Sequence, residues 1–490
     1  MKEYKPTIGL EVHSELKTKT KMFCGCSNNS DEKNPNVNVC PICLGHPGTL
    51  PVINKQAVEM VLRFGLALGA RIPEKSKFDR KNYFYPDLPK AYQISQYDKP
   101  LVIGGKLNNV EITRVHLEED TGRLIHSADG KSSFVDFNRA GVPLMELVTE
   151  PDIKSGKEAM EFAKELQLIL RHLEISDANM EKGQMRVEVN ISISRNNKKG
   201  TKVELKNLNS FRVVGEAIDY EIKRQTEVLE KGDLVIQETR GWNEIKKKTF
   251  SQRIKEEAHD YRYFPEPDLP SIDLSSSAGV FNIENLKISI PELPIDKRKR
   301  FLKEYNLNSE QAEILIEDRS LANYFEESTS ELLEEFGNKE EYIKNIGLLF
   351  NYLSSDLKGL LNEQKITIKE LKITPENFAD LIVLIGKGEI SSKIAKDILK
   401  EMFLTGLDPR QIIEQKGLSR ISDEEVIRTV VREVINKNPK AIEDYKKGKQ
   451  NVIQFLIGQV MAKTKGRADT EMILKLLDKE NKVIDKNDKK

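Results

Sequence analysis

The chain has 490 residues, which at the usual domain size suggests roughly three domains. Its 78 basic and 78 acidic residues cancel to a formal charge of zero, so any polyanionic partner must be met by a local patch. Hydrophobic residues make up 38 % of the sequence, and no run approaches the ~20 apolar residues of a membrane helix, which excludes the membrane-spanning classes. The first residues resemble neither a signal segment nor an import sequence, so we expect an unprocessed cytoplasmic protein.

The first patterned segment, residues 8–13, predicts a strand with one polar face. Glu11 and His13 are two residues apart, which places both side chains on one face of a strand. Leu10 and Val12 then lie on the opposite face. Acid and imidazole on one face make this strand a candidate for chemistry.

The four cysteines of the chain form two close pairs: Cys24, Cys26, Cys40 and Cys43. Two such pairs separated by a short loop can bring four thiolates around one tetrahedral Zn2+. A closed site of four thiolates leaves no open coordination position, so we predict a structural zinc knuckle. A redox-active C-x-x-C motif and a metal-free knuckle are the alternatives, although a redox motif would not explain the first pair.

Residues 79–87 combine cations, an amide and aromatic rings. Arg80 and Lys81 are followed by Asn82 and three aromatic residues, a surface that a nucleotide or nucleic acid could contact. A similar mixture recurs at residues 259–268. The alternative is a pair of loops rich in proline and tyrosine that pack on themselves.

Two further acidic clusters follow on sequence typical of strands. One is the run from His116 to Asp120, and the other comprises Glu146 and Glu150. Hard divalent cations bind carboxylate oxygens, and Mg2+ bound to substrate phosphates typically uses only one or two of them. The acidic clusters are therefore candidates for one Mg2+ site, with the alternative that these acids are simply solvated.

A helix and a hairpin are predicted next. Residues 157–173 carry apolar side chains at helical spacing, whereas residues 185–193 and 202–206 alternate between apolar and polar around a turn-like stretch. The polar face of the predicted hairpin carries Arg186, Glu188, Asn190, Glu204 and Lys206. An ordinary solvated sheet face is the alternative to a functional one.

Beyond the proline-rich residues 265–294, strand signals nearly vanish and amphipathic helices dominate. A softer break lies near residues 405–409. Six basic residues near the carboxyl end are candidate contacts to a phosphate backbone: Lys446, Lys447, Lys449, Lys463, Lys465 and Arg467. A solvated helix face is the alternative. The chain has no P-loop and no dinucleotide-binding glycine motif, so a nucleotide would have to bind in another way.

Several long motifs, in this order, resemble the B subunits of the aspartyl/glutamyl-tRNA amidotransferases. They lie at residues 9–13, 78–87, 138–143, 204–210, 237–242, 260–268, 391–396 and 458–461. The resemblance covers almost the whole chain. One departure is Glu188, in a segment where many relatives have Arg-Cys-Asp.

The resemblance implies an α+β protein with a large, cradle-like catalytic domain built on a mixed sheet. We expect this domain at residues 1–293, including the cysteine knuckle. A helical domain at 294–405 and a small helical, tRNA-binding tail domain at 406–477 would follow. We expect residues 478–490 to be disordered.

The resemblance also implies which residues form the site. Four residues are expected to line the Mg2+ and ATP site: Glu11, His13, Glu119 and Glu146. Five residues are expected to contact the nucleotide: Arg80, Lys81, Tyr83, Lys206 and Asn209. The cysteine quartet is expected to hold Zn2+, which only some members of the family retain.

The implied activity is ATP-dependent conversion of misacylated Glu-tRNA(Gln) or Asp-tRNA(Asn), or both, into the amide. The partners implied are the amidase and the small protein that complete a heterotrimeric amidotransferase, together with the tRNA itself. We identify no nucleophile for releasing ammonia from glutamine, which agrees with a separate amidase. The rival hypothesis is a zinc-stabilised scaffold that binds tRNA without chemistry.

Overall fold

The structure is a computed structural model of the chain. It describes residues 4–195, 198–254, 261–275, 279–336, 338–418, 421, 423–446, 450–464 and 466–487. The chain divides into two compact units, Met1–Asp296 and Lys297–Lys490. No helix among the described residues is long and apolar enough to cross a membrane.

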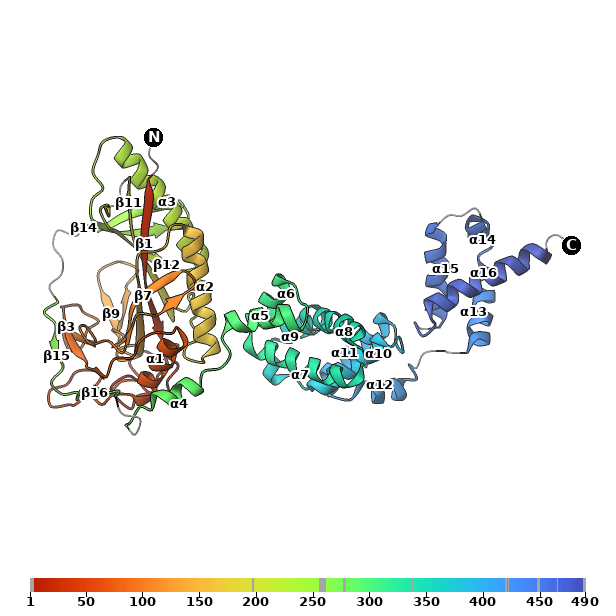
Figure 1. The fold of residues 1–490 in the computed structure, drawn as a ribbon, viewed down its shortest axis with the longest axis horizontal. Helices are drawn as coiled ribbons and strands as arrows, with labels where there is room; N and C mark the ends of the chain where they lie inside the picture. The colour runs from red at the N-terminus through yellow and green to blue at the C-terminus, as the bar shows by residue number, and fades with distance from the viewer. Residues whose placement is uncertain are drawn as a thin grey trace. The chain divides into compact units, whose positions relative to one another are not determined.

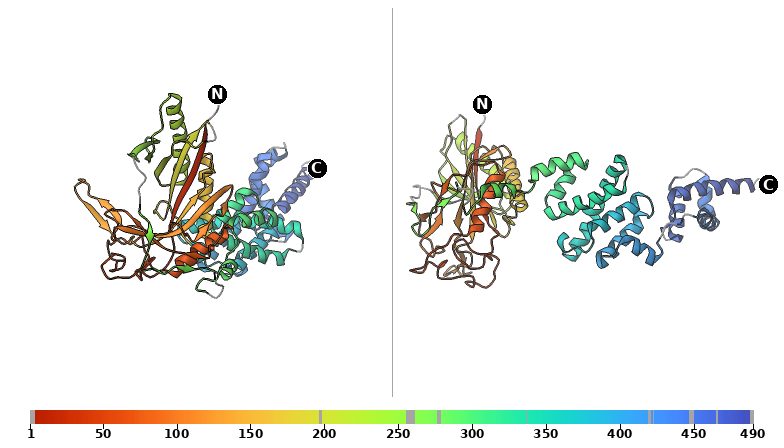
Figure 2. Two further views of the ribbon diagram at one scale, coloured as in Figure 1. Left: turned by 60° about the vertical axis from the view of Figure 1, so that its left-hand side comes forward. Right: turned by 60° about the horizontal axis from the view of Figure 1, so that its bottom comes forward.

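A nine-stranded mixed sheet forms the centre of the first unit. Its strands are β1 (Lys5–Glu15), β5 (Val102–Ile103), β6 (Lys106–Leu107), β7 (Val110–Glu119), β10 (Pro143–Thr149), β11 (Met185–Ser194), β12 (Val203–Leu208), β13 (Glu238–Asn243) and β14 (Lys248–Ile254). They lie in the order β14-β13-β12-β11-β1-β10-β7-β5, and β6 pairs with β7. The β12–β13 pair is parallel, whereas the other pairs are antiparallel. Strand β1, red in Figures 1 and 2, therefore lies in the middle of the sheet.

The central strands have one apolar and one polar face. Ile8 pairs with Ile191 of β11, and Leu10 pairs with Val189, all of them at most 1 % exposed. The intervening residues of β1 carry the polar side chains, as the alternation predicts. The predicted hairpin of residues 185–193 and 202–206 is confirmed as β11 and β12.

Three helices cover the apolar face of the sheet: α1 (Lys55–Ala67), α2 (Gly156–His172) and α3 (Phe211–Glu230). The short helix α4 (Ile283–Ile288) packs against α1. The helix predicted at residues 157–173 is confirmed as α2, which begins where the Ser155 side chain accepts a hydrogen bond from Glu158 N. Leu166 of α2 and Val214 of α3 are fully buried in the same core as β1 and β11.

Short strands outside the main sheet bring distant loops together. β3 (Asp79–Asn82) pairs with both β4 (Tyr92–Ser95) and β15 (Phe264–Pro265). β2 (Lys75–Ser76) pairs with β16 (Ile272–Asp273), and β8 (Arg123–His126) pairs with β9 (Ser133–Asp136). The β3–β15 pair joins the two motifs that combine cations with aromatic rings.

The described part of the second unit is helical (Figure 1). Its elements are α5 (Pro294–Glu304), α6 (Ser309–Ile316), α7 (Arg319–Glu335), α8 (Lys339–Asn351), the π-helix η1 (Tyr352–Leu357), α9 (Lys358–Gln364), the 3-10 helix η2 (Ile368–Glu370), α10 (Pro375–Gly386), α11 (Ser392–Thr405), α12 (Pro409–Lys416), α13 (Glu424–Lys437), α14 (Pro439–Lys446), α15 (Gln450–Lys463) and α16 (Thr470–Asn487). α5 begins just before the boundary between the units. Together with the mixed sheet of the first unit, this arrangement confirms an α+β fold.

The last helix corrects one expectation about the carboxyl end. Disorder was expected from residue 478, but α16 continues to Asn487. Leu476 and Leu477 of this helix are buried in a core shared with α13 and α15, and Glu480 accepts two hydrogen bonds from Arg432. Apolar packing and this ion pair hold the helix past the expected boundary. Residues 488–490 lie outside the described residues.

Candidate functional site

A row of polar side chains crosses the middle of the sheet. In the register of the strands, His13 of β1 pairs with Glu146 of β10, and Glu146 pairs with His116 of β7. Residues paired across antiparallel strands point to the same face, so the three side chains meet on the polar face. His13 Nε2 lies 3.3 Å from Glu146 Oε2, and His116 Nε2 lies 3.4 Å from the same oxygen.

Two more carboxylates, Glu11 and Glu118, complete this cluster. We call it the β1–β10–β7 cluster, and its members are Glu11, His13, His116, Glu118 and Glu146. Glu11 Oε1 and Glu118 Oε1 each lie 3.7 Å from His13 Nε2. The ligand atoms of Glu11, His13 and Glu146 all lie within 4.8 Å of one another, as do those of His116, Glu118 and Glu146. Oxygen and imidazole donors at this spacing can hold a metal ion, and the carboxylates are the donors that Mg2+ prefers.

The charges of the cluster are strongly coupled. Burial disfavours a charged imidazole, yet the hydrogen bond and charge of Glu146 raise the pKa of His13 to about 9. Burial also favours a neutral carboxyl at Glu146, but the charge of His116 and hydrogen bonds from both histidines hold its pKa well below the usual value. Burial, followed by the charge of Glu146, raises the pKa of Glu11.

The structure does not bring Glu119 into this cluster, although the sequence analysis expected it there. Glu119 pairs with Pro143 and lies three residues beyond His116 on β7, an odd number, so it points to the other face. Its carboxylate accepts hydrogen bonds from Lys90 Nζ at 2.7 Å and Ile94 N at 2.9 Å. The neighbouring Glu118 occupies the cluster instead. Strand alternation counted from His116 would have selected Glu118.

Lys81 of β3 is a cation influenced by the negative charges of the cluster. Burial disfavours its charged ammonium, but the negative charge of Glu118, with further contributions from neighbouring tyrosines and Glu146, raises its pKa. Its Nζ lies 5.0 Å from the ring centroid of Tyr261 and 5.9 Å from that of Tyr83. The predicted nucleotide contacts Lys81 and Tyr83 are therefore neighbours of each other beside the cluster.

Arg80 is engaged within the protein. Its Nε and Nη2 donate to the two carboxylate oxygens of Glu266 at 2.7 and 2.8 Å, and its guanidinium lies 4.3 Å from the ring centroid of Tyr92. The Glu266 side chain is fully buried. This bidentate pair fixes β3 to the segment that follows β15. A role for Arg80 in nucleotide binding stays a prediction.

The other two predicted nucleotide contacts lie on or after β12. Lys206 Nζ contacts Glu188 of β11 at 2.8 Å and Glu204 at 3.7 Å, on the polar face that the hairpin pattern predicts. In the pairing of β11 with β1, Glu188 lies opposite Glu11 of the cluster. Asn209 follows β12 and is exposed. Lys206 therefore borders the cluster through Glu188.

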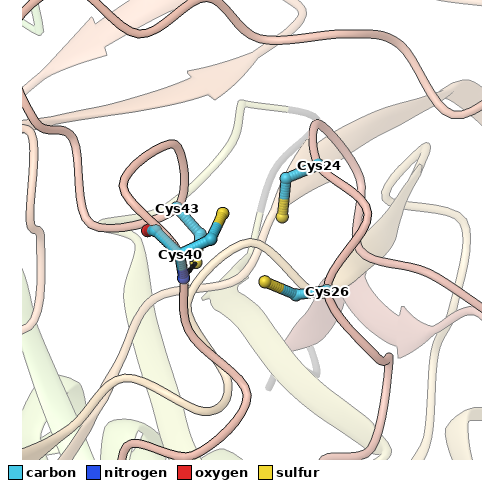
Figure 3. Close-up of side chains that lie close together, drawn as sticks. All are labelled: Cys24, Cys26, Cys40 and Cys43. Atoms are coloured by element: carbon cyan, nitrogen blue, oxygen red, sulfur yellow. Dashed lines mark hydrogen bonds between the residues drawn. The ribbon is translucent and has the colours of Figure 1, made fainter.

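The four cysteine thiols converge in the loops after β1 (Figure 3). Their sulfur atoms all lie within 4.8 Å of one another. Cys40 N donates a hydrogen bond to Cys43 Sγ at 3.1 Å. The fully buried Lys21 places its Nζ 3.9 Å from the same sulfur, and this ammonium also donates to Asn38 O at 2.7 Å.

These contacts favour the thiolate form of Cys43. A hydrogen bond from Cys24, opposed by burial and aided by Cys40 N and the charge of Lys21, lowers the pKa of Cys43 to about 5. Burial raises the pKa of Cys26 to about 11. Thiols that crowd together in this way are the donor set of a closed zinc site.

Comparison with known proteins places the chain in a family. The model of the GatB/GatE catalytic domain matches residues 6–279, more than half of the sequence. The chain belongs to the GatB/GatE family. A second family model, the GatB domain, matches residues 331–480. The resemblance found in the sequence motifs is thereby confirmed.

Individual relatives match this GatB/GatE family member over nearly its full length. Proteins named as the B subunit of aspartyl/glutamyl-tRNA(Asn/Gln) amidotransferase, from Persephonella marina and Caldicellulosiruptor bescii, are each 47 % identical to it, over 97 % and 98 % of this chain and 99 % of each relative. The protein of the same name from Brevibacillus brevis is 46 % identical over 97 % of this chain and 98 % of its own length.

The predicted basic contacts lie in the region that matches the GatB domain. Lys463, at the end of α15, pairs with Glu433, and Arg467 donates to the backbone carbonyls of Thr464 and Gly417. Lys446 ends α14, and its side chain lies outside the described part of the structure. Lys447, Lys449 and Lys465 lie outside the described residues. A phosphate-binding role for these six residues stays a prediction.

Proposed function

We propose that this chain is the phosphorylating and transamidating component of an aspartyl/glutamyl-tRNA(Asn/Gln) amidotransferase. The observation that carries the proposal is the β1–β10–β7 cluster, where three carboxylates and two imidazoles meet beside Lys81. A protein that only binds tRNA has no use for such a cluster. The names of the relatives supply the reaction class.

The cluster fits Mg2+ bound to ATP. Glu11, Glu118 and Glu146 offer oxygen donors, and the spacing of the ligand atoms allows one ion to contact several of them. Mg2+ bound there would neutralise charge on the phosphates of ATP during phosphoryl transfer. His13 would contribute a further ligand atom from the neighbouring strand β1.

Phosphorylation makes the substrate carboxylate reactive. The side-chain carboxylate of Glu-tRNA or Asp-tRNA repels nucleophiles and has no good leaving group. When one of its oxygens takes the γ-phosphoryl group of ATP, the bond between the γ-phosphorus and the bridging oxygen breaks, and ADP leaves. The product is an acyl phosphate.

Ammonia then completes the reaction. Its lone pair attacks the acyl carbon, inorganic phosphate leaves with the electrons of the C–O bond, and the nitrogen loses a proton to give the amide. Lys81 would stabilise negative charge that develops on the phosphoryl oxygens, because its ammonium remains charged beside Glu118 and Glu146. A partner amidase would supply the ammonia, and a small third protein would complete the complex.

The knuckle and the second unit have supporting roles in this proposal. The cysteine quartet would hold a structural Zn2+, since tetrahedral bonds of ~2.3 Å place sulfur atoms about 3.8 Å apart, a spacing within the limit seen among these thiols. The helical region that matches the GatB domain would bind the tRNA through the basic residues near the carboxyl end.

The proposal is tested by assembling the chain with the amidase and the small third protein. Glutamine and ATP are supplied with Glu-tRNA(Gln) or Asp-tRNA(Asn), and amide formation is followed for each tRNA. Amide from either tRNA supports the proposal and also identifies the substrate. A complex that binds both tRNAs but forms no amide and hydrolyses no ATP would instead support the rival scaffold.

A further inference from the structure

Arg186 lies next to the β1–β10–β7 cluster without belonging to it. It pairs directly with His13 across β11 and β1, so its side chain starts from the same polar face of the sheet. One of its guanidinium nitrogens, Nη2, contacts Asp120 Oδ1 at 3.2 Å. Within the described residues, Asp120 is the hydrogen-bond partner of this guanidinium, and 41 % of the Arg186 side chain is exposed.

Asp120 is a rigid anchor for this arginine. Its side chain is 4 % exposed, and its second oxygen is held by Arg139 Nη2 at 2.5 Å. Its two carboxylate oxygens thus face two guanidinium groups, those of Arg186 and Arg139. Arg139 is fixed in turn by Glu15 at 3.0 Å.

The anchor is also tied to the cysteine knuckle. Asn138, which precedes Arg139, accepts a hydrogen bond from Asn38 N at 2.9 Å and donates one to Asn34 O at 2.8 Å. Both partners lie in the loop between the two cysteine pairs. This double contact holds the turn that presents Arg139 to Asp120.

A guanidinium held in this way differs from an ordinary structural ion pair. A buried structural arginine is usually enclosed and bidentate, as Arg80 is with Glu266. Arg186 makes one contact and leaves further donors on an accessible face, beside a cluster whose carboxylates would repel the phosphates of a nucleotide. A planar fork of donors suits phosphate or carboxylate oxygens better than any other side chain does.

We propose that Arg186 binds an anionic oxygen of the reacting groups and that Asp120 positions its guanidinium for this contact. The oxygen belongs either to the phosphates of ATP or to the carboxylate that accepts the phosphoryl group. The inference rests on the proposed function, and it adds a substrate-binding residue and its positioning carboxylate to the site.

The test compares Arg186→Gln and Arg186→Lys with wild type in the assembled complex. The readouts are the KM for ATP, the KM for the misacylated tRNA, and kcat for ATP hydrolysis that depends on this tRNA. We expect Arg186→Gln to lower kcat/KM by about 100-fold and Arg186→Lys, which keeps the charge, to lower it less. A larger KM for ATP assigns the contact to the phosphates, and a larger KM for tRNA assigns it to the carboxylate.

Asp120→Asn tests the positioning role. It should lower kcat/KM by about tenfold, and the double variant with Arg186→Gln should be no worse than Arg186→Gln alone, because both changes remove one interaction. Additive losses would show that Asp120 acts independently of Arg186. The control is Arg212→Gln, which removes an exposed arginine paired with Glu216 on α3, and it should match wild type.

Binding of a non-hydrolysable ATP analogue, measured by calorimetry, separates this inference from the proposed function. If wild type binds the analogue but forms no amide, the proposed function fails, and weaker binding by Arg186→Gln still supports the anion contact. If wild type is active while both Arg186 variants match it in kcat, in both KM values and in analogue binding, the inference is overturned. If Arg186→Gln changes the melting temperature of the protein, the comparison with wild type is made with Arg186→Lys instead.

Discussion

His13 and Glu146 face each other across β1 and β10, with His13 Nε2 3.3 Å from Glu146 Oε2. Glu146 contacts the imidazole of His116 on its other side, so it is the central residue of the row. The contact joins residues that are far apart in the sequence and brings acidic groups from three strands to one place.

Glu118 and Glu119 should behave differently although they are neighbours. Glu118 belongs to the cluster, whereas Glu119 binds Lys90 and Ile94 N on the other face. We expect Glu118→Gln to raise the Mg2+ concentration needed for half-maximal ATP hydrolysis by at least about tenfold. Glu119→Gln should leave this Mg2+ dependence unchanged.

The measurement is a Mg2+ titration of tRNA-dependent ATP hydrolysis by the assembled complex. Glu111→Gln is the matched control, because Glu111 lies on the same strand, β7, but is exposed at its other end. The assignment of faces would be wrong if Glu119→Gln shifted the Mg2+ dependence and Glu118→Gln did not.

These two glutamates also mark how far sequence reasoning reaches. The alternation of residues 185–193 correctly predicts β11, and the spacing of Glu11 and His13 correctly places both on one face. The pairing of β1 with β10, and of β10 with β7, joins segments that lie far apart in the chain, so local patterns cannot give it. Without that register, the choice between Glu118 and Glu119 rested on the resemblance alone.

The same limit applies to Arg80 and Arg186. Both are arginines within motifs that suggest chemistry, and nothing local distinguishes them. Tertiary contacts do: Arg80 meets a buried carboxylate that follows β15, whereas Arg186 keeps an exposed guanidinium. The cysteine quartet needs no such context, because its spacing alone identifies the residues that converge.

The zinc knuckle should contribute to the stability of the first unit. We expect about one Zn2+ per chain, and removal by a chelator should lower the melting temperature by about 5 °C or more. Cys40→Ser should lower both the zinc content and the melting temperature. Metal analysis and calorimetry provide the readouts. A chain that contains no zinc and melts identically with and without chelator would contradict the zinc assignment.

The Arg80–Glu266 pair should be structural. Glu266→Gln keeps the shape of the side chain but removes its charge, leaving Arg80 without its bidentate partner. We expect a loss of about 2–3 kcal/mol in the free energy of unfolding, measured with urea. Glu111→Gln again serves as the exposed control. A loss below about 0.5 kcal/mol would mean that the pair contributes little.

The basic residues near the carboxyl end should bind the tRNA backbone. Changing Lys446, Lys447 and Lys449 to Gln should weaken tRNA binding and reduce the slope of log K against log salt by about 2–3, because each lost phosphate contact releases about one counterion fewer. The control changes the exposed Lys17, Lys55 and Lys157 of the first unit, with the same loss of charge. Equal effects in both triple variants would argue against a localised patch.

Trapping of the acyl phosphate tests the central claim most directly. The assembled complex is given misacylated tRNA and ATP without glutamine, and hydroxylamine is added to convert any acyl phosphate into a stable hydroxamate. We predict hydroxamate with the wild-type chain and none above background when Glu11 and His13 are both changed to Ala. Wild-type yields from the double variant, in a complex that still binds tRNA, would contradict the assignment of phosphorylation to this cluster.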